Sequence, residues 1–226
     1  MKRLTNIVLG CVAGLAAVAV WTIIRPPPGW VTPSANAPTN SAESSAVANV
    51  AFGQDDLTDV LYDAPVFELT DADGKPFGSK DLVGKPYAVM FFFSECKGVC
   101  PGMTSRMHDL QNQLKGTNVQ IVSFTVDPVN DTPEKLAGHR AAIGADADRW
   151  HLLTGTPQQM MQTAAGFKMP YDAPVNHSGN FLLIDKRGKV RGIYQSTDVL
   201  QTKDINEAQE SMNRMSADAK TLSEES

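Results

Sequence analysis

A chain of 226 residues is long enough for one ordinary domain with additional segments, and its 42% hydrophobic and 20% charged residues are typical of a globular protein. Lys2, Arg3 and Arg25 are the charged side chains of the first 25 residues, so residues 26–226 carry 17 basic and 25 acidic side chains. This acidic balance argues against a nucleic-acid partner, because such a partner requires a basic surface.

The first 25 residues differ in composition from the rest of the chain. Residues 7–24 contain no charge, and as a helix these 18 residues would be about 27 Å long, close to the thickness of the hydrocarbon layer. Lys2 and Arg3 precede this stretch, which predicts that they stay in the cytoplasm and that the rest of the chain faces outward. We therefore expect a single membrane anchor over residues 1–25. A cleaved signal peptide is the alternative.

The remaining chain divides into a linker and a folded domain. Residues 26–56 are rich in Pro, Ala, Ser and Asn and have no helical or strand period, which predicts a flexible linker. Residues 57–222 are expected to form the domain.

Within the domain, strands and helices are expected to alternate. Asp73-Gly74 predicts a hairpin turn, and Thr132-Pro133 and Thr156-Pro157 each predict the start of a helix. Buried strands are expected at 86–93 and 119–126, and a short strand at 150–153. Further helices are expected at 99–114 and from about 203, and a second hairpin at 181–194. Such an order predicts a central sheet with helices on its faces.

Two cysteines stand at the exit of the first buried strand, in "FFFSECKGVCPGM", residues 91–103. Pro101 places Cys96 and Cys100 at the start of a helix, where unpaired backbone N–H groups favour a thiolate. Residues four apart in a helix have Cβ atoms about 5–6 Å apart, whereas a disulfide needs roughly 3.5–4.5 Å. Cys96 must therefore lie in a loop if the pair can oxidise.

Three functions compete for such a pair, namely thiol–disulfide exchange, peroxide reduction and metal binding, and a purely structural disulfide is a fourth interpretation. The spacing of three residues mildly favours a metal, because two sulfurs bridged by an ion tolerate a wider separation. A thiol peroxidase usually has Thr or Ser three residues before its cysteine, and Phe93 stands there. Met103 and Met107 follow at helical spacing and are expected to pack in the core.

A third metal ligand would be a histidine. His177 is the strongest candidate, because small polar residues surround it in a loop directly before a strand. His108 would lie two helical turns beyond the cysteines, His139 is expected on the solvated surface, and His151 falls within a short strand. Two thiolates and one imidazole make a soft site of low coordination, which selects Cu(I).

These residues resemble a known family. "FFFSECKGVCPGM" is similar to the CxxxCP motif of the Sco/SenC family, copper chaperones that help to mature cytochrome c oxidase. Residues 122–136, 150–160 and 176–194 resemble further segments of that family in the same order, so the resemblance covers about residues 57–200.

The resemblance implies a thioredoxin-like fold on a single membrane anchor, with the soluble domain in the periplasm or on the outer face. It implies that Cys96, Cys100 and His177 hold copper, as Cu(I) with Cu(II) as a further candidate, and that Cys96 and Cys100 form a reversible disulfide. Asp127 is a candidate accessory residue, with a turn role before Pro128 as the alternative. The implied partners are the copper-receiving subunit of cytochrome c oxidase and a thiol–disulfide partner.

Two functions remain open on these grounds. The first is a membrane-tethered metallochaperone that delivers copper to the copper site of an oxidase, maintains the thiols of that site, or does both. The alternative is a periplasmic thiol–disulfide reductase that needs the dithiol but not His177. The chain departs from the family at Lys97-Gly98, where Pro-Asp is common.

Overall fold

The computed structural model describes residues 57, 59–169, 179–195 and 205–225, and all of them belong to one compact unit, residues 47–226. Across these described ranges, no helix combines the length and the apolar character needed to cross a membrane. The predicted anchor, residues 1–25, and the predicted linker, residues 26–56, lie outside the described residues.

An eight-stranded sheet forms the centre of the domain, with strand order β1-β8-β7-β4-β5-β6-β2-β3. The strands are β1 Tyr62–Asp63, β2 Glu68–Asp71, β3 Pro76–Gly78, β4 Tyr87–Phe92, β5 Gln120–Thr125, β6 Trp150–Thr154, β7 Asn180–Ile184 and β8 Lys189–Gln195. β4, β5 and β6 pair in parallel, and the other pairs are antiparallel. Every residue of β4 and β5 is buried, as predicted for these two strands.

The helices are η1 Ser79–Leu82, a 3₁₀ turn, and the α-helices α3 Cys100–Gln113, α4 Pro133–Ala142, α5 Pro157–Gly166 and α6 Ile205–Glu224. The two predicted Thr-Pro starts are confirmed. Thr132 Oγ1 accepts the backbone N–H of Lys135 to cap α4, and Thr156 Oγ1 accepts that of Gln159 to cap α5.

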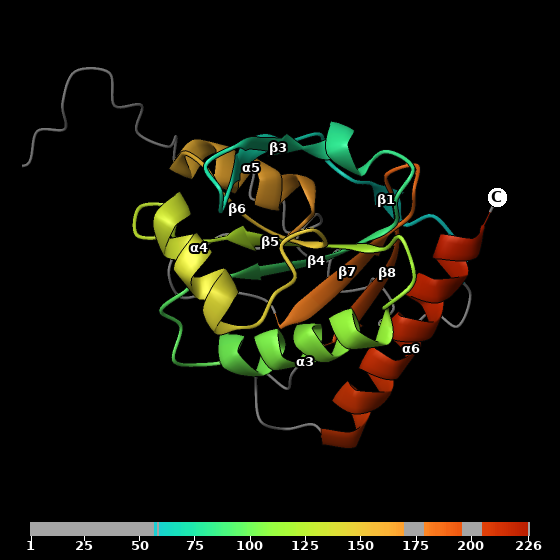
Figure 1. The fold of residues 1–226 in the computed structure, drawn as a ribbon. Helices are drawn as coiled ribbons and strands as arrows, with labels where there is room; N and C mark the ends of the chain where they lie inside the picture. Colours follow the sequence, from blue (N-terminus) through green and yellow to red (C-terminus); the bar gives the residue numbers. More distant parts are fainter. Residues whose placement is uncertain (1–56, 58, 170–178, 196–204, 226) are drawn as a thin grey trace, which may run out of the picture. The chain divides into compact units, whose positions relative to one another are not determined.

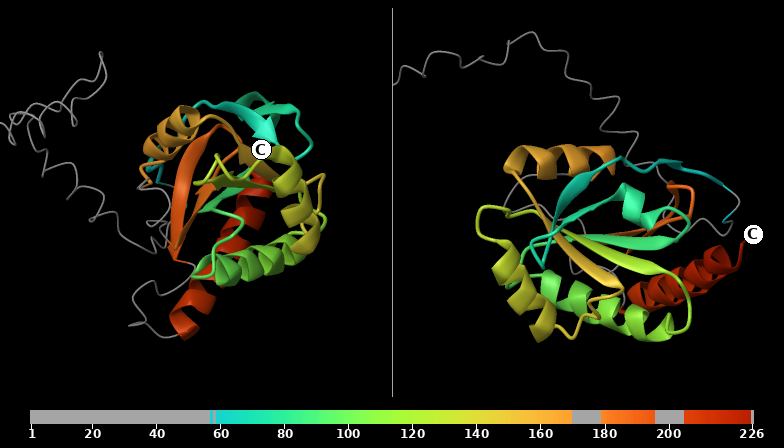
Figure 2. Two further views of the ribbon diagram at one scale, coloured as in Figure 1. Left: turned by 90° about the vertical axis from the view of Figure 1, so that its left-hand side faces the viewer. Right: turned by 45° about the horizontal axis from the view of Figure 1, so that its top comes forward.

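The sheet carries helices on both faces (Figure 1). Ala88, Met90 and Phe92 of β4 pack in one apolar cluster with residues of α3, α4 and α6, whereas Val89 and Phe91 pack in a second cluster with residues of α5. The views in Figure 2 likewise keep α5 on the opposite side of the sheet from α3 and α6. The side-chain period of two along β4 thus divides the core into two layers.

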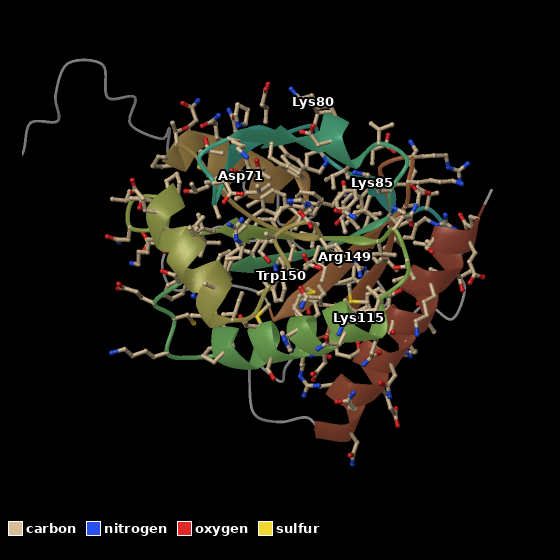
Figure 3. The ribbon with its side chains drawn as sticks, in the orientation of Figure 1. Asp71, Lys80, Lys85, Lys115, Arg149 and Trp150 are labelled. Atoms are coloured by element: carbon tan, nitrogen blue, oxygen red, sulfur yellow. The ribbon has the colours of Figure 1, made fainter. Side chains whose placement is uncertain are left out.

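Trp150 anchors the start of β6 in the first of these layers, which it shares with side chains of α3 and α4. Its indole is 1% exposed and donates from Nε1 to Ser123 Oγ at 2.8 Å (Figure 3). The neighbouring Arg149 reaches back along the sheet, and its Nη2 donates to the carbonyls of Leu114 and Val119 at 2.8 and 3.1 Å. Adjacent residues therefore join the start of β6 both to β5 and to the two ends of the loop between α3 and β5.

Two short elements were not predicted from the sequence. β1 has only two residues, Tyr62 and Asp63, which pair with β8, so no alternating pattern could develop there. η1 is a four-residue turn that begins after Gly78. The helix predicted from about residue 203 is confirmed as α6, and its apolar side chains are buried at a step of three or four residues from Ala208 to Leu222.

Candidate functional site

The two predicted cysteines lie where β4 leaves the sheet. Phe93 to Cys96 form a turn in which the N–H of Cys96 donates to the carbonyl of Phe93 at 3.2 Å. Cys96 is half-buried in this loop, and Cys100 is the first residue of α3, with Pro101 directly after it. The spacing of the two cysteines required Cys96 to lie in a loop if the pair can oxidise, and this condition is met because Cys96 is not helical. β4 and β5 are parallel, so their carboxyl ends meet beside this loop.

Both cysteines are reduced, and their side chains are hydrogen-bonded to each other. Cys100 is 4% exposed and belongs to the apolar cluster beneath α3, and Cys96 packs against that cluster. The sheet, the turn and the helix start therefore hold two sulfurs next to each other at the rim of the core.

The surroundings of Cys100 favour its neutral form. Burial raises the pKa of its thiol, and the hydrogen bond with Cys96 raises it further. The backbone N–H groups of Phe93 and of Cys100 itself lower the pKa, but burial outweighs them. The expectation that the helix start alone favours a thiolate is thus wrong for Cys100, because that argument leaves out the cost of burying the charge.

An open cavity of about 410 Å³ lies beside the two sulfurs. One wall comes from the turn and from α3 between Cys100 and His108, and the other comes from the end of α4. The lining residues are Phe93, Ser94, Cys96, Cys100, Pro101, Thr104, Ser105, His108, His139 and Ile143. Both cysteines thus border a hollow that is large enough for side chains of a partner.

Two histidines line this cavity, contrary to the sequence-based interpretation of both. His139 is half-buried, stacks on Phe92 with ring centroids 5.5 Å apart, and has its pKa lowered mainly by burial. It is therefore not a solvated surface residue. His108 faces the same cavity rather than lying away from the site, and its Nδ1 lies 3.3 Å from Asn112 Nδ2.

The third histidine within the described residues, His151, lies outside the cavity wall. It stacks on Phe77 at 4.2 Å and pairs with Gln120 across the sheet at 3.1 Å. Such contacts indicate a structural role within the sheet, where His151 links β6 to β5 and to Phe77 of β3. His177, the predicted imidazole ligand, lies outside the described residues.

Asp127, the predicted accessory residue, begins the turn after β5. Its carboxylate accepts both bonds from Asn130 Nδ2, at 2.8 and 3.0 Å, and its carbonyl accepts the N–H groups of Asn130 and Asp131. These bonds describe a turn residue, the alternative interpretation. A site role for its carboxylate would require these bonds to rearrange.

The sequence offered no reason to select Asp131, which the structure places under the cysteine turn. It is 1% exposed and accepts hydrogen bonds from Ser94, two residues before Cys96. An acidic residue directly before the Thr132 cap is the only signal, and it does not distinguish a buried carboxylate from an exposed one. Across residues 57, 59–169, 179–195 and 205–225, no three His, Cys, Asp or Glu side chains are grouped closely enough to hold a metal.

Comparison with known proteins identifies the family. The SCO1/SenC family profile matches residues 59–214, which is well over half of the chain and includes both cysteines. The chain belongs to the SCO1/SenC family. The family predicted from the resemblance of four sequence segments is therefore confirmed.

Solved structures of the SCO1/SenC family share the fold. A SCO1/SenC family lipoprotein from Bacillus anthracis is 35% identical, with a TM-score of 0.65 over 75% of this chain and 100% of that chain. BsSco, a member of the Sco family of cytochrome c oxidase assembly proteins in which a disulfide switch was identified, is 31% identical, with a TM-score of 0.62 over 73% of this chain and 96% of that chain. The predicted thioredoxin-like α/β fold is confirmed by this likeness.

One curated relative carries a name that concerns a metal. A provisionally named copper-binding protein from Stutzerimonas stutzeri is 31% identical over 139 residues, which make up 57% of this chain and 67% of that protein.

Proposed function

We propose that this SCO1/SenC protein binds copper as cargo through Cys96, Cys100 and His177 and delivers it to the copper site of a cytochrome c oxidase. The observation that carries the proposal is the pair of hydrogen-bonded thiols beside an open cavity at the carboxyl ends of β4 and β5. The copper-binding relative and the oxidase assembly protein among the similar proteins support the cargo and the receiver.

The described residues suit a soft metal. Two adjacent sulfurs bind Cu(I) well, because soft thiolates at low coordination select it over harder ions. A bound cation would also offset the burial that holds Cys100 neutral, since metal binding removes the thiol proton. His177 would complete the set, and Asp127 would act only by exchanging its bonds with Asn130.

Anaerobic titration of the reduced full-length chain with Cu(I), against a competing chromophoric chelator, tests the ligand set. We expect His177→Ala and Cys96→Ser each to weaken binding strongly. His108→Ala is the matched control, because His108 lines the same cavity but is not a proposed ligand. Unchanged affinity in His177→Ala would refute the proposed imidazole ligand.

Thiol–disulfide exchange is a second candidate function, favoured by the direct contact between the two thiols. The sulfur of one cysteine, as the thiolate, would attack a partner's disulfide and form a mixed disulfide, which the second sulfur would then resolve. Cys96 and Cys100 would lose two electrons and two protons, and the partner's disulfide would gain them as two thiols.

An assay of thiol–disulfide exchange, in which the reaction is quenched at set times, separates disulfide reduction from copper delivery. Reduction of a partner disulfide requires both cysteines but not His177, whereas copper delivery requires all three residues. His177→Ala that still reduces a partner disulfide but no longer binds Cu(I) would show that the two activities are separable.

We propose further that residues 1–25 anchor the chain in the cell membrane and that residues 26–56 tether residues 57–222 on the outer face. The uncharged stretch at 7–24 with Lys2 and Arg3 before it supports the anchor, and the lipoprotein among the similar structures supports attachment to a membrane. Protease added to intact spheroplasts should digest the domain. Full protection from protease would contradict the proposed orientation.

A further inference from the structure

The carboxylate of Asp131 is hydrogen-bonded to the turn that contains Cys96. Asp131 follows β5, in the turn before α4, and is 1% exposed. Its Oδ2 accepts the backbone N–H of Ser94 at 3.1 Å, and its Oδ1 accepts the hydroxyl of the same residue. Two hydrogen bonds to one residue fix both the position and the orientation of that residue.

The carboxylate itself is held from the side of the sheet. Thr125 Oγ1, at the end of β5, donates to Asp131 Oδ2 at 2.5 Å, and Lys135 Nζ lies 3.9 Å from Oδ1. A buried carboxylate is costly unless it is fully hydrogen-bonded, so these donors keep it in one place. Asp131 therefore holds Ser94 at a fixed position relative to the end of the central strand β5.

The turn held by Asp131, residues 93–96, contacts both sulfurs. Ser94 is the second residue of the turn closed by the bond from the Cys96 N–H to the Phe93 carbonyl. The N–H of Phe93 donates to the sulfur of Cys100, and the two thiols are hydrogen-bonded to each other. Movement of Ser94 would consequently shift Cys96 and remove a donor from Cys100.

A second link joins α4 to the same turn. Lys135 Nζ pairs with Glu95 Oε1 at 2.7 Å, but the glutamate side chain is 74% exposed. Exposed ion pairs contribute little, so this link is weaker than the buried bonds of Asp131.

We propose that Asp131 is a positioning residue, which acts through Ser94 to hold Cys96 and Cys100 at the separation that their shared chemistry requires. The inference rests on the proposed function only in taking these two cysteines as the working pair. A hydrophobic residue at position 131 would satisfy the packing, but it would leave the N–H and hydroxyl of Ser94 without their partner.

Asp131→Asn tests the proposal, because an amide keeps the shape but cannot accept the same set of hydrogen bonds. With the reduced full-length chain, we expect Cu(I) affinity to fall about tenfold, the usual effect of losing a group that orients metal ligands. We also expect the equilibrium constant for the Cys96–Cys100 disulfide, measured in glutathione buffers by thiol alkylation, to fall at least about threefold, because a freed turn holds the sulfurs apart more of the time.

Asp185→Asn is the matched control. Asp185 is also 1% exposed, and it accepts the N–H groups of Arg187 and Lys189 and pairs with Arg191. It follows Ile184, which is opposite Tyr87, so it lies at the amino end of β4, away from the cysteines. A general loss of rigidity would appear in both variants, whereas a positioning effect would appear only in Asp131→Asn.

Ser94→Ala provides a second test if Asp131→Asn does not fold. It removes one of the two bonds from Ser94 and should give a smaller loss in the same direction for both readouts. When both variants fold, the double variant should be no worse than Asp131→Asn alone, since the two residues act through one contact.

The proposal is overturned if Asp131→Asn and Ser94→Ala leave both readouts at wild-type values, or if Asp185→Asn changes them equally. These results differ from failure of the proposed function. If the wild-type chain binds no Cu(I), copper delivery fails, and the disulfide equilibrium alone still decides the role of Asp131.

Discussion

At the scale of single residues, the chemistry of the site is set by how deeply each sulfur is buried. Cys100 stands at a helix start, yet burial raises the pKa of its thiol despite two backbone donors. Cys96, one turn of loop away, is half-buried and borders the open cavity. The two sulfurs therefore differ in access, and we expect the more accessible Cys96 to meet an incoming partner first.

A buried hydrogen bond in the core gives a first prediction. Trp150 Nε1 donates to Ser123 Oγ, and both side chains are at most 2% exposed. Ser123→Ala leaves the indole N–H without a partner, so we expect the free energy of unfolding to fall by about 1–3 kcal/mol. Urea denaturation followed by circular dichroism measures the loss. Ser223→Ala, in the last turn of α6, is a serine control for which a change within about 0.5 kcal/mol is expected.

His151 gives a prediction about pH. Burial lowers its pKa in the folded protein below the ordinary value of about 6.5. As the pH falls, the unfolded chain takes up a proton at this histidine before the folded chain does, so stability is lost from near pH 6.5 downward until the folded pKa is passed. Unfolding measured between pH 7.5 and 5 should show a smaller loss in His151→Gln than in the wild type. An equal slope in both proteins would contradict this assignment.

At the scale of elements, two helices begin with the same device. α4 and α5 both start with Thr as the cap and Pro as the first helical residue, and the α5 cap is completed by Gln159, whose side chain accepts the N–H of Thr156. Both starts were predicted from the sequence, because capping depends on residues that are adjacent in the chain.

The α5 cap can be tested without disturbing the cysteines. Thr156→Ala removes the acceptor for the N–H of Gln159, so we expect a loss of about 1 kcal/mol in the free energy of unfolding. Thr156→Ser keeps the acceptor and should restore most of the stability. The Cys96–Cys100 disulfide equilibrium should be unchanged in both variants, since α5 packs on the other face of the sheet.

Local signals also explain which parts of the site could be predicted. Cys96 and Cys100 were found because a motif of five residues carries them at the end of an apolar strand. Asp131 and His139 were not, because their roles depend on contacts with Ser94 and Phe92 that are about 40 residues away in the chain. The two-residue strand β1 was missed for a similar reason, since only its pairing with β8 makes it a strand.

At the scale of the whole domain, the two layers of the core differ in their relation to the cysteines. The layer with α3, α4 and α6 contains Cys100, while the other layer, with α5, contains neither cysteine. α6 joins the first layer from the far end of the chain, and Tyr194 of β8 donates to its Asp218 at 2.5 Å. The last helix thus supports the same layer that holds the sulfur.

Matched methionines test how much that support contributes. Met215 of α6 is fully buried, whereas Met161 of α5 is 50% exposed. Met215→Ala removes apolar contacts and leaves a cavity, so we expect the free energy of unfolding to fall by about 2–5 kcal/mol. Met161→Ala, the same chemical change at the surface, should stay within about 0.5 kcal/mol. Because Met215 and Cys100 share one cluster, Met215→Ala should also increase the rate at which a bulky maleimide labels Cys100, whereas Met161→Ala should not. Equal labelling rates in the two variants would show that α6 stabilises the fold without shielding the buried thiol.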